Sequence, residues 1–263
     1  MKVLVIQNKI YKSIQHTLKS IQSTLDSLNN VDFDFILFPE MFTTPYDKTS
    51  IINYGLFTNE IIAFLTRTAQ TYHCYVIGGS LPEISQGKYY NTSFIFNRKG
   101  VIINKYRKNH LFSITYPNGT TFNEADVITP GNELITFDTE FGKMGICICF
   151  DIRFPVLVRR LMKKGASVIF VPASFNTYTG PLHWRITFRA RAIDNQLFII
   201  GASPARNSYG SYIPYGHSIC VNPLGQVLHE LTSKKGYFIA HLDLNQISKT
   251  RKQLPIIQND YDI

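Results

Sequence analysis

The 263-residue chain has little cysteine and no long hydrophobic run. Its four cysteines are too few for the disulfide framework of a small secreted protein, and thiols persist in a reducing compartment. No apolar stretch approaches the ~18 residues that cross a bilayer, and the N-terminal apolar run is too short for a signal sequence. We therefore expect a cytoplasmic protein with no membrane partner. The composition, 44% hydrophobic and 17% charged, predicts a single globular domain over residues 1–263.

Signatures of nucleic-acid binding are also missing, although the chain is basic. Lys and Arg number 27 against 18 Asp and Glu, a net charge of +9. These residues form no unbroken run of five, and no Cys/His finger spacing is present. This distribution indicates solvated surface with a general attraction for anions. We expect no nucleic-acid partner, and a non-enzymatic basic binding protein is kept as the alternative from another functional class.

Strand-like runs and helical stripes alternate along the chain without a linker. Strands are predicted at residues 3–6, 33–38, 75–77, 92–96, 101–106, 144–149, 168–171, 197–202, 218–221, 226–231 and 238–242. Apolar residues spaced by three and four predict helices at residues 14–28 and 61–72, and two more at 155–164 and 184–196. This mixture of βα units and β meanders predicts paired mixed sheets with helices outside. Residues from about 246 to 263 are expected to form a C-terminal arm beyond the core.

Cys149 closes an apolar strand and precedes a sharp turn and a helix that opens at Pro155. This is the layout of a nucleophile elbow, and helix N-terminal dipoles with a nearby lysine are expected to lower the pKa of the thiol. Cys147 is expected on the same face, deeper in the strand. The alternative is that both cysteines are small core residues.

Glu40 and Lys108 are the other residues with a plausible chemical role. Glu40 follows a strand that Pro39 ends, in a setting where partial desolvation is expected to raise the carboxyl pKa toward the range of a general base. Lys108 lies in a basic and aromatic segment and could stabilise an oxyanion. Taken singly, an ordinary surface glutamate and an exposed lysine are the simpler interpretations.

The combination of motifs is more specific than any one of them. The segments Phe38–Glu40, Tyr106–Phe112 and Ile146–Asp151, together with Tyr90-Asn-Thr92 and Arg189–Asn195, resemble the nitrilase superfamily of carbon–nitrogen hydrolases over essentially the whole chain. Further segments resemble its ω-amidase branch: Asn109–Ile114, Thr121–Glu124 and Asn176–Pro181. The resemblance implies an α/β fold, a four-layer αββα sandwich, and a homodimer or higher homo-oligomer.

The resemblance also implies the roles of four residues. Cys149 would be the nucleophile, Glu40 the general base, Lys108 the oxyanion-stabilising cation and Glu124 a second glutamate that orients the lysine. No metal or organic cofactor is implied. Phe150 stands where many relatives have tyrosine, and its backbone N–H could help to hold the oxyanion. Four residues near strand ends are candidates for the substrate pocket: Tyr46, Phe150, Phe175 and Asn176.

The activity implied is that of an ω-amidase. Such an enzyme hydrolyses the terminal carboxamide of a small carboxylate compound, of the α-ketoglutaramate or α-ketosuccinamate type, to acid and ammonia through a thioester. Alternatives within the superfamily are a deaminated glutathione amidase, an N-carbamoyl amidohydrolase and a nitrilase. The segment between Tyr46 and Phe57 is shorter than expected for the ω-amidase branch and lies where a pocket lid would be. The final segment, Gln253–Tyr261, is also abbreviated.

Overall fold

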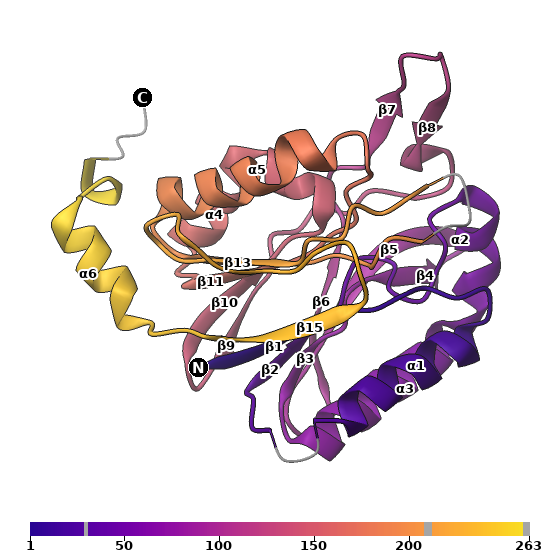
Figure 1. Ribbon diagram of the computed structural model, residues 1–263, viewed down its shortest axis with the longest axis horizontal. Coiled ribbons are helices and arrows are strands. Elements are labelled where there is room, and N and C mark those ends of the chain that lie inside the picture. Colours follow the sequence, from indigo (N-terminus) through magenta and orange to yellow (C-terminus); the bar gives the residue numbers. More distant parts are fainter. Residues whose placement is uncertain (29–30, 208–211, 260–263) are drawn as a thin grey trace.

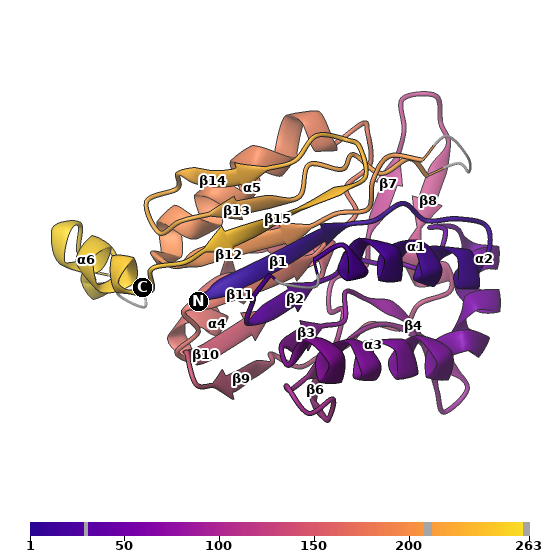
Figure 2. The same ribbon diagram turned by 60° about the horizontal axis from the view of Figure 1, so that its bottom comes forward.

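A computed structural model describes residues 1–28, 31–207 and 212–259, in which two β-sheets pack face to face. Helices cover the outer side of each sheet, so the layers run helix, sheet, sheet, helix (Figure 1). The view in Figure 2 shows the same layers from another side, with strand β15 next to β1. The predicted αββα order is confirmed.

The first sheet has the strand order β15-β1-β2-β3-β5-β4, and β6 also pairs with β5. Its strands are β1 (Lys2–Gln7), β2 (Phe35–Leu37), β3 (Tyr75–Ile77), β4 (Leu81–Ser85), β5 (Lys88–Phe96), β6 (Ile102–Arg107) and β15 (Gly236–His241). Strands β1, β2 and β3 are parallel, whereas β4, β5, β6 and β15 pair antiparallel with their neighbours. The predicted antiparallel hairpin corresponds to β5 and β6.

The second sheet has the order β14-β13-β12-β11-β10-β9. Its strands are β9 (Thr136–Thr139), β10 (Gly142–Ile146), β11 (Val168–Pro172), β12 (Phe198–Ala202), β13 (Ile219–Val221) and β14 (Val227–Glu230). Between the sheets lies the largest buried cluster, in which the ring centroids of Phe35 and Phe170 are 5.2 Å apart. This contact joins one sheet to the other.

Helices α1 (Ile14–Asp26) and α3 (Thr58–Tyr72) cover the first sheet, and α4 (Pro155–Lys163) and α5 (Gly180–Asn195) cover the second. The predicted stripe of α1 is buried at Ile14, Leu18, Ile21 and Leu25. The Ser13 side chain accepts a hydrogen bond from a backbone N–H of the first turn and fixes the start of this helix. Pro155 opens α4, as predicted, because proline fits the first helical turn.

Several boundaries differ from those predicted. The strand expected at residues 33–38 is β2, which is limited to Phe35–Leu37, and the strand expected at residues 144–149 ends at Ile146. Helix α5 begins four residues before Trp184, at Gly180. Polar or short segments gave no clear periodicity, so the sequence did not predict α2 (Lys48–Tyr54), the 3-10 turn η1 (Gly55–Phe57), β4, β9, or the hairpin of β7 (Ser113–Thr115) and β8 (Thr121–Asn123).

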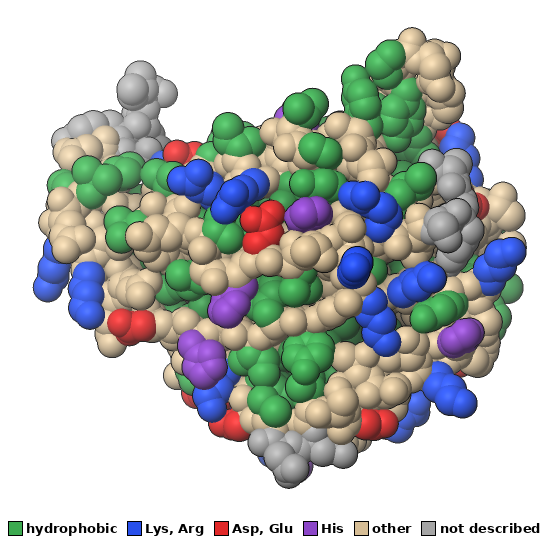
Figure 3. All heavy atoms as spheres, viewed as in Figure 1, with side chains coloured by type: hydrophobic (Ala, Val, Ile, Leu, Met, Phe, Trp, Pro, Cys, Tyr) green, Lys and Arg blue, Asp and Glu red, His purple; other side chains and the backbone are tan. Residues whose placement is uncertain are grey.

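Two parts project from the layered body. The β7–β8 hairpin stands out at one end, and the C-terminal segment with α6 (Asn245–Gln253) and a 3-10 turn (Ile257–Asn259) extends at the other (Figure 1). This second projection lies in the segment where the sequence predicts an arm, whose last residues, 260–263, lie outside the described residues. Among the described residues, no helix is both long and apolar enough to span a membrane. On the face drawn in Figure 3, Lys and Arg side chains are spread over the surface among other side chains, and some lie next to one another.

Candidate active site

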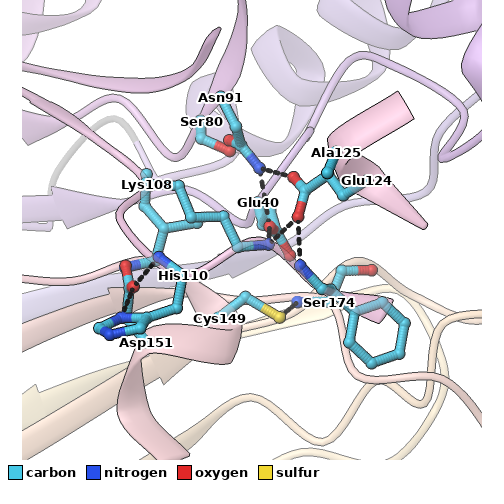
Figure 4. Close-up of polar contacts among 12 residues, drawn as sticks. Glu40, Ser80, Asn91, Lys108, His110, Glu124, Ala125, Cys149, Asp151 and Ser174 are labelled. Atoms are coloured by element: carbon cyan, nitrogen blue, oxygen red, sulfur yellow. Dashed lines mark hydrogen bonds and ion pairs between the residues drawn. The ribbon is translucent and has the colours of Figure 1, made fainter. Parts of the chain in front are cut away.

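Cys149 lies just past β10, at the start of the 3-10 turn η3 (Cys149–Arg153). Its φ of 48° is in the left-handed region, which costs an ordinary residue about 1–2 kcal/mol. Because of this turn, the Cys149 side chain does not follow the alternation of side chains along β10. The Ser174 N–H, from the segment after β11, contacts Sγ at 3.5 Å (Figure 4). The predicted strand-to-turn change is therefore present, although it begins before Cys149.

Glu40, Lys108 and Glu124 meet in one buried ion cluster (Figure 4). Lys108 Nζ donates to Glu40 Oε1 at 2.9 Å and to Glu124 Oε2 at 2.7 Å, and all three side chains have no exposed surface. Each residue stands at the end of an element: Glu40 after β2, Lys108 after β6 and Glu124 after β8. The fold thus gathers three of the residues that the sequence singled out.

Asn91 on β5 connects the two glutamates. Its Nδ2 donates to Glu40 Oε1 and to Glu124 Oε1, each at 2.9 Å, and its backbone oxygen accepts a bond from the Lys108 N–H. The motif Tyr90-Asn-Thr92 contributed to the family resemblance, but it indicated no role for the asparagine. Only the pairing of β5 with β6 places the amide between the carboxylates.

The two oxygens of Glu40 have different surroundings. Oε1 accepts hydrogen bonds from Asn91, Lys108 and the Tyr46 hydroxyl, the last at 3.1 Å. Oε2 is buried and has no hydrogen-bond partner in the structure. Burial raises the pKa of the Glu40 carboxyl, Lys108 opposes this, and Glu124 adds to it. The predicted rise in the pKa of Glu40 is confirmed, and a buried carboxylate oxygen remains open to accept a proton.

The pKa of the Cys149 thiol is raised, not lowered as the sequence predicted. Burial is the main cause, the neighbouring Glu40 carboxylate adds to the rise, and Lys108 acts against it. A local dipole and a lysine were expected to dominate, but the desolvation of the sulfur outweighs them. The resting group is therefore a thiol, which needs a base to become a nucleophile.

A small cavity adjoins this cluster. It is lined by residues that include Glu40, Tyr46, Ser174, Asn207 and Tyr212. Tyr46 thus lies where the sequence predicted a pocket residue, with its hydroxyl 3.2 Å from Lys108 Nζ. Tyr212, which the sequence did not single out, donates a short hydrogen bond to the Ser174 carbonyl and packs its ring 4.7 Å from that of Tyr46.

The other three predicted pocket residues are not part of this cavity wall. Phe150 packs its ring on Phe112 at 5.4 Å, and Phe175 packs edge-on against Trp184 at 5.0 Å. The Asn176 side chain accepts hydrogen bonds from Thr179 and donates one to the Tyr116 hydroxyl. No described group of three His, Cys, Asp or Glu side chains is arranged to hold a metal ion.

Arg153, at the end of η3, is a cation that sequence reasoning missed. Its guanidinium lies 4.4 Å from the ring centroid of Phe175, and Nη1 is 2.9 Å from His183 Nδ1. Within the described ranges no acidic side chain pairs with it. Burial lowers the pKa of Arg153, while Cys149 and Tyr212 act in the opposite direction. Arg153 is therefore a half-buried cation near Cys149 that has no acidic partner in the described ranges.

Comparisons with known proteins identify the family of the chain. Residues 2–252 match the carbon–nitrogen hydrolase family model. The chain is 39% identical over 240 residues to Omega-amidase NIT3 of Saccharomyces cerevisiae. The aligned region covers 88% of this chain and 82% of that protein. It is 38% identical over 226 residues to Omega-amidase NIT2 of Mus musculus, in an alignment that covers 86% of this chain and 82% of that protein. The crystal structure of Saccharomyces cerevisiae Nit3, a member of branch 10 of the nitrilase superfamily, matches with a TM-score of 0.90 at 34% identity, over 99% of this chain and 97% of that one.

Proposed function

The chain belongs to the carbon–nitrogen hydrolase family, and from its active-site geometry we propose that it is a cysteine-dependent ω-amidase. It is a hydrolase of non-peptide C–N bonds that resembles ω-amidases, which excludes the alternative of a non-enzymatic basic binding protein. The observation that carries the proposal is the buried Oε2 of Glu40, which has no hydrogen-bond partner among the described residues and belongs to the carboxylate whose charge helps to raise the pKa of Cys149.

In the first half-reaction, Glu40 takes the thiol proton at Oε2 while Sγ of Cys149 attacks the amide carbon. Lys108 Nζ already donates to Glu40, Glu124 and Tyr46, and the bond to Tyr46 is the longest at 3.2 Å. We expect this third N–H to turn to the developing oxyanion, with the Phe150 N–H as a second donor. Glu40 then returns its proton to the leaving nitrogen, and ammonia departs from the thioester.

In the second half-reaction, water occupies the place that ammonia left. Glu40 accepts a proton from this water, whose oxygen attacks the thioester carbon. Collapse of the intermediate breaks the C–S bond, the proton returns to sulfur, and the carboxylic acid is released. The net reaction converts one amide and one water into one acid and one ammonia. Glu124 and Asn91 hold Lys108 and Glu40 in place throughout.

Arg153 supports a substrate that carries a carboxylate. The guanidinium has no acidic partner in the described parts of the chain and lies near Cys149, so a substrate anion can supply the missing charge. A small keto acid with a terminal carboxamide, such as α-ketoglutaramate or α-ketosuccinamate, places one carboxylate and one amide in a single compact molecule.

The homodimer and the cytoplasmic location also belong to the proposal. Leu182 and Ile186 on the outer side of α5 are 68% and 67% exposed, which gives this face an apolar character that a second copy could cover. All four cysteines are free thiols, as expected in a reducing compartment. The oligomeric state is testable by light scattering of the purified protein.

The test of function is ammonia release from α-ketoglutaramate, with glutamine as the comparison substrate and Cys149→Ala as the control. We expect turnover of the keto amide and loss of all but a trace of it in the variant, while Cys220→Ala remains active. A panel of N-carbamoyl compounds, deaminated glutathione and a nitrile identifies the alternatives. Consumption of the nitrile alone would refute the amidase proposal.

A further inference from the structure

The Asp151 carboxylate, two residues after the nucleophile, is fully buried and has four hydrogen-bond contacts. Figure 4 shows the two that His110 makes. Oδ1 accepts the backbone N–H of His110 and contacts the Nδ1 of the same ring, both at 2.8 Å. Oδ2 accepts the Ile148 N–H at 3.0 Å and the Tyr106 hydroxyl at 2.7 Å. A buried carboxylate needs such partners, because an unpaired polar group is costly away from water.

The donors come from the two segments that carry Lys108 and Cys149. Tyr106 and His110 stand two residues before and two residues after Lys108, and Ile148 immediately precedes Cys149. The Asp151 N–H also donates to the Ile148 carbonyl at 3.1 Å, so Asp151 and Ile148 bond each other reciprocally across the turn. One side chain therefore fixes the left-handed turn of the nucleophile and ties it to the chain on both sides of the lysine.

We propose that Asp151 is a positioning residue that sets the placement of Cys149 relative to Lys108. This inference rests on the proposed function, in which Lys108 holds the oxyanion formed by attack from Cys149. Neither Glu40 nor Glu124 can do the same, because the structure shows no hydrogen bond from either to the backbone of the nucleophile turn. Asp151 does not line the cavity, so in this proposal it acts through the segments that it joins.

The position requires a carboxylate, since each of its oxygens accepts a backbone N–H, and a backbone N–H cannot become an acceptor. An asparagine has nearly the same shape but only one oxygen. Whichever way its amide is turned, the NH₂ group faces a backbone donor at the distance where an oxygen stood. Asp151→Asn is therefore expected to separate the two segments without leaving a large cavity.

The test measures kcat, KM and the pH profile of Cys149 alkylation by iodoacetamide in Asp151→Asn. We expect kcat to fall about 100-fold with KM changed less than about threefold, as for a misplacement on the order of 1 Å. The alkylation midpoint should move to higher pH, because Lys108 moves away from the sulfur whose pKa it lowers. Loss of the Asp151 charge alone would move the midpoint to lower pH.

Asp34→Asn is the matched control. The Asp34 carboxylate also accepts a backbone N–H, from Lys2, and a bond from Arg98, but it has no contact with the site. This variant should lose stability while its kcat and alkylation midpoint stay at wild-type values. If Asp151→Asn is folded and keeps both values, the proposal is overturned.

Should Asp151→Asn fail to fold, Tyr106→Phe removes one donor to Oδ2 and keeps the ring. It should lower kcat about fivefold, consistent with one hydrogen bond of about 1 kcal/mol, and raise the alkylation midpoint. An unchanged kcat and midpoint in this variant would also overturn the proposal. Alkylation needs no amide substrate, so failure of the ω-amidase assignment is distinguishable from failure of this inference.

Discussion

Strand β6 and the residue that follows it take part in two ion clusters with opposite properties. Lys105 and Arg107 bond the Glu83 carboxylate on β4 at 2.7 and 2.9 Å, and their side chains are 46% and 26% exposed. Lys108, the next residue, bonds Glu40 and Glu124 where no side chain is exposed. Two cations share one carboxylate in the first cluster, and two carboxylates share one cation in the second.

The pKa shifts of the carboxyl groups follow this difference. Burial acts to raise the pKa of Glu83, but hydrogen bonds from Arg107, Lys105 and Thr92 outweigh it and lower the pKa to about 2. The pKa of Glu40 is raised, because complete burial and the second carboxylate outweigh its lysine. Where cations outnumber carboxylates near solvent, the pKa of the carboxyl is lowered and the group stays ionised. Where buried carboxylates outnumber the cation, the pKa of a carboxyl rises toward the range of a base.

The strongest contrast is expected from matched Glu→Gln changes. Glu40→Gln removes the proton acceptor and should lower kcat about 1,000-fold, within the usual range for a general base. Glu83→Gln should keep kcat within about threefold of wild type, because its cluster lies outside the site. Steady-state ammonia release measures both. Equal losses of kcat in the two variants would contradict the division of roles between the clusters.

Substituting the cations compares how much each cluster contributes to the free energy of unfolding. Lys108→Met leaves two buried carboxylates without a counter-charge, and we expect a loss of about 3–5 kcal/mol in the free energy of unfolding. Lys105→Met breaks a partly exposed pair and should lose at most about 1 kcal/mol. Urea denaturation followed by circular dichroism gives both values. The contrast fails if Lys108→Met is no less stable than Lys105→Met.

Arg153 extends the comparison to a cation with no carboxylate of its own. Arg153→Met should raise KM for α-ketoglutaramate about tenfold, as expected from the loss of one charge-assisted hydrogen bond to a substrate anion. KM for an amide without a carboxylate, such as butyramide, should change little. Arg107→Met, which removes a paired cation, is the control. A rise in KM that is the same for both substrates would count against a carboxylate-binding role.

The smallest effect is the acid dependence of stability at Glu83. With a folded pKa of about 2 and an unfolded pKa near 4.3, the unfolded chain binds more protons between these values. The stabilisation is therefore fully present above about pH 5 and is lost as the pH falls toward 2. The difference in melting temperature between wild type and Glu83→Gln should narrow from pH 6 to pH 3. A constant difference would show that Glu83 does not carry this dependence.

Local patterns in the sequence predicted much of the frame. The stripe of Ile14, Leu18, Ile21 and Leu25 gave helix α1, because its spacing matches the helical period. Pro39 and Pro155 marked a strand end and a helix start through the fixed geometry and missing N–H of proline. These features depend on neighbours in the chain. The hairpin β7–β8 escaped prediction because each of its strands has only three residues, too few to show a period.

The site shows the limit of such reasoning. Family resemblance pointed to Glu40, Lys108, Glu124 and Cys149, but it could not show which oxygen of Glu40 is free. Asn91 and Tyr212 carried no signal of their own, because an asparagine in a strand and a tyrosine in a loop are common. Their importance comes from contacts such as that between Asn91 and Glu40, which are 51 residues apart in the chain.

The sequence by itself thus determined most of the longer elements and the family, since these follow from local periodicity and from motifs. Only the tertiary structure decided which ionisable side chains pair with one another and how deeply each is buried. It reversed the expected shift in the pKa of Cys149, because burial of the sulfur outweighs the lysine. It also joined Asp151 to both sides of Lys108. Desolvation and shared hydrogen bonds arise when distant segments pack together, and no local pattern encodes them.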